Sequence, residues 1–189
     1  MSRIGIFGGS YNPIHNGHIS IAEELLQTGF VDEIWFVISP QNPLKQKADL
    51  WPDELRFEIA EKALESHPRL RPCDVEYHLP KPSYMWTTLN ELRNQYPGHQ
   101  FVLLIGADNW LLFSRWYRSE DILENFELGI YPRPGYEINE AELPENVHFF
   151  NTGLYDISST EIRRRLKAGE SIEGLVPESV VEFLSLLKP

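Results

Sequence analysis

Two histidines and several small residues lie together in a loop near the start of the chain. They are Gly8, Gly9, Ser10, His15, Gly17 and His18. Glycines let backbone N–H groups approach an anion closely, and imidazole N–H groups can donate hydrogen bonds to phosphate oxygens and to charge that develops in a transition state. The loop therefore indicates a phosphate site. Simpler readings stay open: a plain Gly-Gly turn, solvated histidines, or a histidine pair for a metal, although no third ligand is evident.

A second group of hydroxyl and guanidinium side chains lies near the other end of the chain. Ser158, Thr160 and Arg163 fall at the expected start of a helix. A helix N-terminus offers free N–H groups and a partial positive charge, and an arginine one turn later adds a bidentate donor for phosphate. The alternatives are a capping box between Ser158 and Glu161 and a solvated helix face for the three consecutive arginines.

Three further features could contact a nucleotide. Asp108, with Gly106 beside it, follows an apolar run and could accept from ribose hydroxyls or cap the next helix. Lys45 lies in a polar segment that could reach over phosphates or simply be an exposed loop. Trp116 and Tyr117 could stack on a planar ligand or belong to the core.

Short apolar runs alternate with helical patterns along the chain and must position these groups. Strands are expected over residues 3–7, 33–39, 75–77, 101–105, 127–131 and 147–150. Helices are expected after residue 18, after Pro52, and over 84–96, 160–167 and 178–187, and over 111–126 with a break near Ser114. The strongest strands are apolar on both faces, which predicts an α/β fold: a Rossmann-like parallel sheet with helices on both faces and a small C-terminal helical region. Ligands of such sheets bind at the carboxyl ends of the strands.

Composition narrows the class of protein. The 189 residues include 17 basic and 28 acidic side chains, for a net charge of −11, which argues against a nucleic-acid polymer as partner. The single cysteine, Cys73, excludes an internal disulfide. The N-terminus lacks signal-peptide features, and the longest apolar run, 101–107, is too short to span a membrane. We expect a cytoplasmic protein with one domain over 1–189, including a helical part over 156–189, with no membrane partner. The sequence is compatible with a homo-oligomer.

The string His15-Asn16-Gly17-His18 and the string from Ser158 to Arg163 together resemble the nucleotidyltransferase superfamily that carries a His-x-Gly-His motif. Residues 8–13, 82–84, 104–108, 116–117 and 133–136 look like one family within it, the bacterial nicotinate-nucleotide adenylyltransferases. The resemblance covers nearly the whole chain. It implies transfer of the adenylyl group of ATP to nicotinate mononucleotide, giving nicotinate adenine dinucleotide and pyrophosphate. It also implies that Mg²⁺ is required with the ATP phosphates, with no protein side chain expected as its ligand.

The resemblance also implies roles for individual residues. In this family the acceptor's own phosphate attacks phosphorus, so the expected catalytic residues, His15, His18, Lys45 and Arg163, bind and stabilise charge. The ATP site is expected to hold Gly8, Gly9, Ser10, His15, Gly17, His18, Gly106, Asp108, Ser158, Thr160 and Arg163. The nicotinate mononucleotide site is expected to hold Ser10, Lys45, Tyr84, Met85, Trp116, Tyr117 and Arg133, with Trp116 stacked on the nicotinate ring.

The chain departs from the family pattern in two places. Ser10-Tyr11-Asn12-Pro13 stands where the family commonly has Thr-Phe-Asp-Pro, which keeps the hydroxyl and loses a charge. Met85 stands where the family commonly has threonine, near the nicotinate carboxylate. Met85 therefore leaves open an enzyme that accepts nicotinamide mononucleotide, alone or as well. A phosphopantetheine adenylyltransferase and a non-catalytic nucleotide-sensing module are the remaining alternatives.

Overall fold

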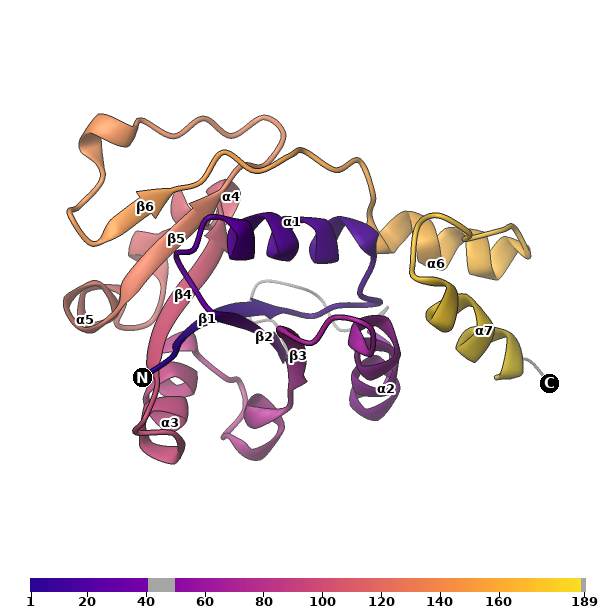
Figure 1. Ribbon diagram of the computed structural model, residues 1–189. Helices are drawn as coiled ribbons and strands as arrows, with labels where there is room; N and C mark the ends of the chain where they lie inside the picture. Colours follow the sequence, from indigo (N-terminus) through magenta and orange to yellow (C-terminus); the bar gives the residue numbers. More distant parts are fainter. Residues whose placement is uncertain (41–49, 188–189) are drawn as a thin grey trace.

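A six-stranded, wholly parallel sheet forms the centre of the protein in the computed structural model, which describes residues 1–40 and 50–187 (Figure 1). The strands lie in the order β3-β2-β1-β4-β5-β6. Their bounds are β1 (Arg3–Gly9), β2 (Glu33–Ile38), β3 (Leu70–Cys73), β4 (Gln100–Gly106), β5 (Glu127–Tyr131) and β6 (Val147–Phe149). This is the strand order of a Rossmann fold, so the predicted fold class is confirmed.

Helices connect the strands. The α-helices are α1 (Asn16–Gln27), α2 (Asp53–Leu64), α3 (Met85–Gln95), α4 (Ala107–Trp110), α5 (Ser119–Asn125), α6 (Ser159–Ala168) and α7 (Glu178–Leu186). Short 3₁₀ turns add η2 (Val75–His78), η3 (Phe113–Arg115) and η4 (Glu140–Glu142). No helix in the described ranges is long and apolar enough to cross a membrane.

The alternation of side chains along each strand produces two cores, one on each face of the sheet. In β1, Ile4 and Ile6 enter one core and Phe7 enters the other, because successive side chains of a strand point to opposite faces. Residues of α1, α2, α6 and α7 cover the Phe7 side, and residues of α3, α4 and α5 cover the side of Ile4 and Ile6. Figure 1 shows α1 and α3 on opposite faces of the sheet.

One prediction of secondary structure is wrong. Residues 75–77 form the turn η2 instead of a strand, because the Tyr77 N–H donates to the Asp74 carbonyl and closes a tight turn. The strand lies just before it, in β3, where Pro72 is tolerated because β3 is at the edge of the sheet.

The helical segment over 111–126 is interrupted, as expected. It forms η3 and α5, and the interruption ends at Arg118, whose backbone has a left-handed φ of 57°.

The topology places three chain segments at the carboxyl edge of the sheet. β1 and β4 are neighbours, and the strand order reverses between them, so the loops after Gly9 and Gly106 leave the sheet in opposite directions. α6 lies beside the N-terminal end of α1 (Figure 1), which brings the C-terminal part of the chain to the same edge. The segments that carry the expected phosphate-binding residues therefore meet at this edge of the sheet.

Candidate active site

His15 and His18 lie at the N-terminal end of α1, with their rings stacked at a centroid distance of 3.6 Å. The His15 backbone N–H donates to His18 Nδ1 at 3.3 Å, so the His18 proton is on Nε2 and that atom is a donor. His15 is only 5% exposed, and burial lowers its pKa to about 4, with the Arg133 charge acting in the same direction. His15 is therefore neutral at neutral pH. Both rings can donate hydrogen bonds toward an anion at the helix terminus.

Tyr11 supports this pair, and sequence reasoning missed it. Its hydroxyl donates to the Phe7 carbonyl at 2.6 Å, and its ring meets the His18 ring edge-on at 5.0 Å. The backbone at Tyr11 has a φ of 42°, in the left-handed region that non-glycine residues seldom adopt. The sequence did offer a sign of this role. Tyr11 begins a Tyr-Asn-Pro segment and follows Gly8-Gly9 by two residues, so it was bound to lie close to the histidine loop.

α6 docks on the loop that precedes the histidines. Ser159 Oγ donates to the Pro13 carbonyl at 2.8 Å, and Arg163 Nη1 donates to the Asn12 carbonyl at 2.8 Å. Arg163 Nη2 also lies 3.5 Å from Thr160 Oγ1. These contacts join two motifs that are far apart in the sequence at one edge of the sheet.

The neighbouring side chains of α6 have structural tasks. Ser158 caps the helix by accepting from the Glu161 N–H at 3.2 Å, so half of the expected capping box is present. The other half is absent because the Glu161 carboxylate accepts from Arg164 and Arg165 instead. Of the three consecutive arginines, Arg163 is therefore the one that meets the first loop.

Gly106, Asp108 and Arg133 meet where β4 and β5 end. Asp108 Oδ1 and Arg133 Nε lie 3.6 Å apart. A Cβ built on Gly106 would come within 2.5 Å of Asp108 Oδ1 and 2.9 Å of Arg133 Nε, so a larger residue there would displace these two side chains. Gly106, and not Asp108, is the N-cap of α4. The capping reading of Asp108 is therefore not realised, and its carboxylate faces Arg133.

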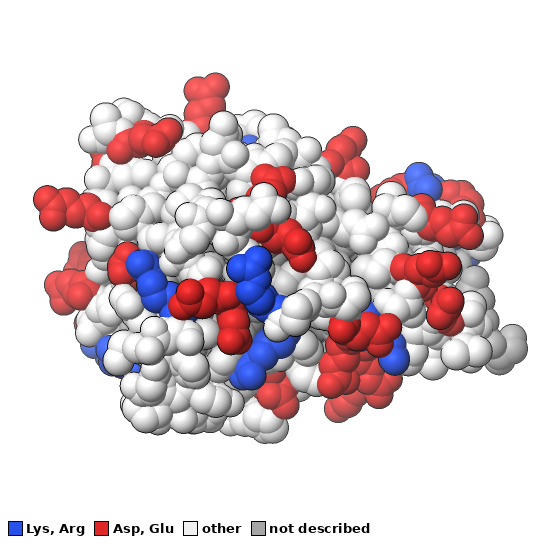
Figure 2. Space-filling model, viewed as in Figure 1, with Lys and Arg blue, Asp and Glu red and all other residues white. Residues whose placement is uncertain are grey.

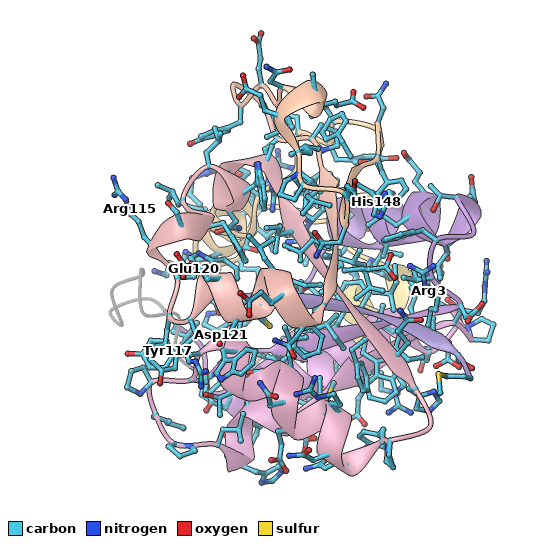
Figure 3. All side chains as sticks on the ribbon, turned by 90° about the vertical axis from the view of Figure 1, so that its left-hand side faces the viewer. Arg3, Arg115, Tyr117, Glu120, Asp121 and His148 are labelled. Carbon is cyan, nitrogen blue, oxygen red and sulfur yellow. The ribbon has the colours of Figure 1, made fainter. Side chains whose placement is uncertain are left out.

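The aromatic side chains expected at the acceptor site form contacts with one another and with Phe113. The Tyr84 and Tyr117 rings lie 4.9 Å apart, and the half-buried Trp116 packs against Phe113 at 5.3 Å. Tyr117 is 53% exposed and projects on the opposite side of the molecule from Arg3 and His148 (Figure 3). Met85 begins α3, and its terminal methyl group lies against Gly8, where a Cβ would come within 2.8 Å of it.

Arg56 is a second residue that sequence reasoning missed. Its guanidinium is fully buried and donates to the carbonyls of Ser10, Ser39 (3.0 Å) and Trp51 (3.0 Å), and to Asp53 Oδ1 (2.6 Å). It therefore ties the loop after β1 to the end of β2 and to the start of α2. Its helical spacing could have revealed the burial. Arg56 precedes Ile59 by three residues and Ala60 by four, which places all three on the same, buried face of α2.

The structure thus brings the two histidines, Arg163, Asp108, Arg133 and the aromatic group to one edge of the sheet. Lys45 lies outside the described residues. Acidic side chains are spread over the face shown in Figure 2, and the basic ones on that face are few and flanked by acids.

Comparisons with known proteins agree with this arrangement. Residues 6–165 match the family model described as cytidylyltransferase-like. A "probable nicotinate-nucleotide adenylyltransferase" of Bacteroides fragilis is 47% identical over 179 residues, covering 95% of this chain and 89% of its own length. The protein of the same name from Bacteroides thetaiotaomicron is 46% identical and covers 96% and 90%.

A solved structure shares the fold. Nicotinic acid mononucleotide adenylyltransferase of Plasmodium falciparum, complexed with NaAD, has a TM-score of 0.81 over 99% of this chain and 96% of its own, at 19% identity. The relatives at 46–47% identity confirm the resemblance drawn from the motifs. The chain belongs to the cytidylyltransferase-like family and, within it, to the nicotinate-nucleotide adenylyltransferases, which are nucleotidyltransferase enzymes.

Proposed function

We propose that the protein transfers the adenylyl group of ATP to nicotinate mononucleotide, a step of NAD biosynthesis, and releases pyrophosphate. One observation carries this proposal: Arg163 of α6 is hydrogen-bonded to the loop that leads into His15 and His18. The arrangement combines a helix N-terminus, two imidazoles and a guanidinium at one place, which suits a polyphosphate. The aromatic group of Trp116 and Tyr117 lies at the same edge of the sheet and suits a planar base.

The proposed chemistry needs no nucleophile from the protein. An oxygen of the acceptor's phosphate attacks the α-phosphorus of ATP, the new P–O bond forms, and the bond to the bridging oxygen breaks. Pyrophosphate leaves with that electron pair. His18 donates from Nε2 to the phosphate oxygens on which charge increases, and Arg163 holds the leaving phosphates, so catalysis rests on alignment and electrostatic stabilisation.

Mg²⁺ would enter with the ATP phosphates. The described residues include no group of three or more His, Cys, Asp or Glu side chains that could hold a metal ion, and Asp108 faces Arg133. The side chains at the site are imidazoles and a guanidinium, which donate hydrogen bonds to phosphate oxygens. A hard cation such as Mg²⁺ prefers oxygen ligands, which these groups do not supply. Bound there, Mg²⁺ would neutralise phosphate charge.

The remaining residues divide between the two substrates. Gly8, Gly9, Ser10 and Gly17 line the phosphate loop, Ser158 and Thr160 start α6, and Gly106 with Asp108 would hold the nucleotide sugar. Trp116, Tyr117, Tyr84, Met85 and Arg133 would hold nicotinate mononucleotide, and Lys45 would add a cation. Met85 packs on Gly8 through its side chain, so its backbone N–H is the group we assign to the nicotinate carboxylate.

The test is product formation from ATP and Mg²⁺ with nicotinate mononucleotide, nicotinamide mononucleotide and phosphopantetheine in parallel. Pyrophosphate release and product mass are followed together. We expect fast turnover with nicotinate mononucleotide only. Comparable turnover with the nicotinamide form would replace the proposal with a dual-specificity enzyme, and no turnover in folded protein that binds ATP would replace it with a sensing module.

A further inference from the structure

Glu76 is a buried carboxylate that the proposed reaction does not use. It lies in η2 and is 2% exposed. Ser83 Oγ donates to its Oε2 at 2.7 Å, and Thr88 Oγ1 donates to its Oε1 at 2.7 Å. Both hydroxyl residues are buried as well. Removing either donor would leave a buried oxygen without a partner, which is costly, so the three side chains hold a fixed arrangement.

This arrangement sets the start of α3. Ser83 precedes Tyr84 and Met85 in the chain, and Thr88 lies one turn beyond them. The Thr88 N–H donates to the Tyr84 carbonyl at 3.1 Å, which is a first hydrogen bond of the helix. Tyr84, the N-cap residue, has no side-chain cap of its own. The carboxylate of Glu76 therefore holds this helix start from both sides of Tyr84 and Met85.

The helix start faces the acceptor side of the site. The Tyr84 ring contacts Tyr117, the neighbour of Trp116, and the Met85 side chain reaches Gly8 at the end of β1. Within the described part of the chain, the side-chain hydrogen bonds of Glu76, Ser83 and Thr88 join residues 76–88 to one another, and none of them reaches His15, His18 or α6. A change in this network should thus move Tyr84 and Met85 first. Their contact with the phosphate loop is that of the Met85 side chain with Gly8, so the KM of the acceptor should change more than the KM of ATP.

We propose that Glu76 is a positioning residue for the mononucleotide acceptor, which it serves by fixing Tyr84 and Met85 through Ser83 and Thr88. This inference rests on the proposed function, because it concerns the same acceptor. In this inference a buried carboxyl group determines where the base of the acceptor lies, although it does not itself contact the substrate.

The experiment compares Glu76→Gln, Thr88→Val, Thr88→Ser and Ser83→Ala with the wild type. KM for nicotinate mononucleotide, KM for ATP, kcat and Tm are measured for each. Glu76→Gln and Thr88→Val should raise KM for the mononucleotide by about tenfold, while KM for ATP and kcat stay within about threefold, because uniform binding of one substrate is lost. Thr88→Ser keeps the hydroxyl and should restore KM. Ser83→Ala tests the other oxygen if a more severe variant does not fold.

The matched control is Asn146→Ala, at the residue just before β6. Asn146 Nδ2 donates to the carbonyls of Leu123 and Phe126 at 2.6 and 3.0 Å, so its loss also removes two internal hydrogen bonds. This variant should lower Tm and leave both KM values unchanged. Equal rises of both KM values, or a lower Tm with unchanged kinetics, in the Glu76 and Thr88 variants would overturn the inference alone. A wild type that does not use nicotinate mononucleotide would overturn the proposed function and the inference with it.

Discussion

The histidine pair acts through its protonation states and its geometry. The His18 ring accepts at Nδ1 from the backbone, which leaves Nε2 as the donor atom of that ring, and the stacked His15 ring is kept neutral by burial and by Arg133. A neutral His15 avoids the repulsion that two stacked imidazolium ions would have. At the residue scale, the site is therefore arranged to donate hydrogen bonds to an anion.

His18→Ala tests this role. The variant removes a donor to the phosphate oxygens and should lower kcat by about 10²–10³, the usual cost of losing a transition-state donor. Steady-state rates at saturating ATP and acceptor measure the effect, and Tm shows whether the fold survives. A folded variant whose kcat stays within about threefold of the wild type would contradict the role.

Burial of His15 makes stability depend on pH. Its pKa is about 4 in the folded protein and near its ordinary value of 6.5 in the unfolded chain, so between these values the unfolded state binds more protons. Stability should therefore fall as pH drops from 6.5 toward 4, by about 1.4 kcal/mol per pH unit from this group. Urea unfolding from pH 7 to pH 5 measures it, and His15→Gln, which cannot titrate, is the control. Parallel curves for the two proteins would show that His15 does not contribute.

At the scale of elements, the site depends on α6 meeting the loop before α1. Ser159 and Arg163 donate to carbonyls of that loop. In the other direction, the Asn16 side chain at the start of α1 donates to the Gly174 carbonyl, which follows α6, at 2.9 Å. The C-terminal part of the chain is thus held to the first loop at several points. Loss of this docking would separate the guanidinium from the histidines.

Arg163→Ala should lower kcat/KM for ATP by about 10²-fold, because a charge-assisted donor to phosphate and the bond to Asn12 are both lost. Arg163→Lys keeps the positive charge but loses the paired N–H donors of the guanidinium, so it should recover only part of the lost kcat/KM. Arg164→Ala is the matched control, since Arg164 is exposed and pairs with Glu161 and Glu170. Steady-state kinetics with varied ATP compare the three variants. Equal losses in Arg163→Ala and Arg164→Ala would mean that α6 is merely perturbed.

The elements also show what the sequence could predict. Apolar runs predicted β1, β2, β4 and β5, because buried parallel strands are apolar on both faces. β3 escaped notice because Arg71 and Pro72 interrupt its pattern, which an edge strand tolerates. Arg56 and Glu76 escaped for a different reason. Charged residues in a sequence are expected at the surface, and their burial depends on partners from other elements.

At the scale of the whole molecule, one buried cation connects the loops that carry the site. Arg56 of α2 donates to Ser10 and Ser39, which lie 46 and 17 residues away in the chain. These carbonyls belong to the first residues after two neighbouring strands, β1 and β2. The clamp therefore sets how the phosphate loop leaves the sheet, although Arg56 itself is fully buried.

Arg56→Ala should lower the free energy of unfolding by about 3–5 kcal/mol, because three carbonyls lose this donor and Asp53 is left with its longer ion pair to Lys81. Urea unfolding at neutral pH measures the change. Arg115→Ala is the control, because Arg115 is exposed and projects away from the molecule (Figure 3), and it should change stability by less than about 0.5 kcal/mol. A similar small effect in Arg56→Ala would show that the clamp is not needed for folding.

The central claim is that the protein aligns two substrates and that the acceptor's own phosphate attacks ATP. The most direct test uses ATP labelled with ¹⁸O at the bridge between the α- and β-phosphorus atoms, incubated with enzyme and Mg²⁺ in the absence of acceptor. Without the acceptor no bond to the α-phosphorus should break, so the label should stay at the bridge, and it should leave in pyrophosphate once nicotinate mononucleotide is added. Movement of the label to non-bridging positions before the acceptor is added would reveal an adenylylated enzyme and contradict the account.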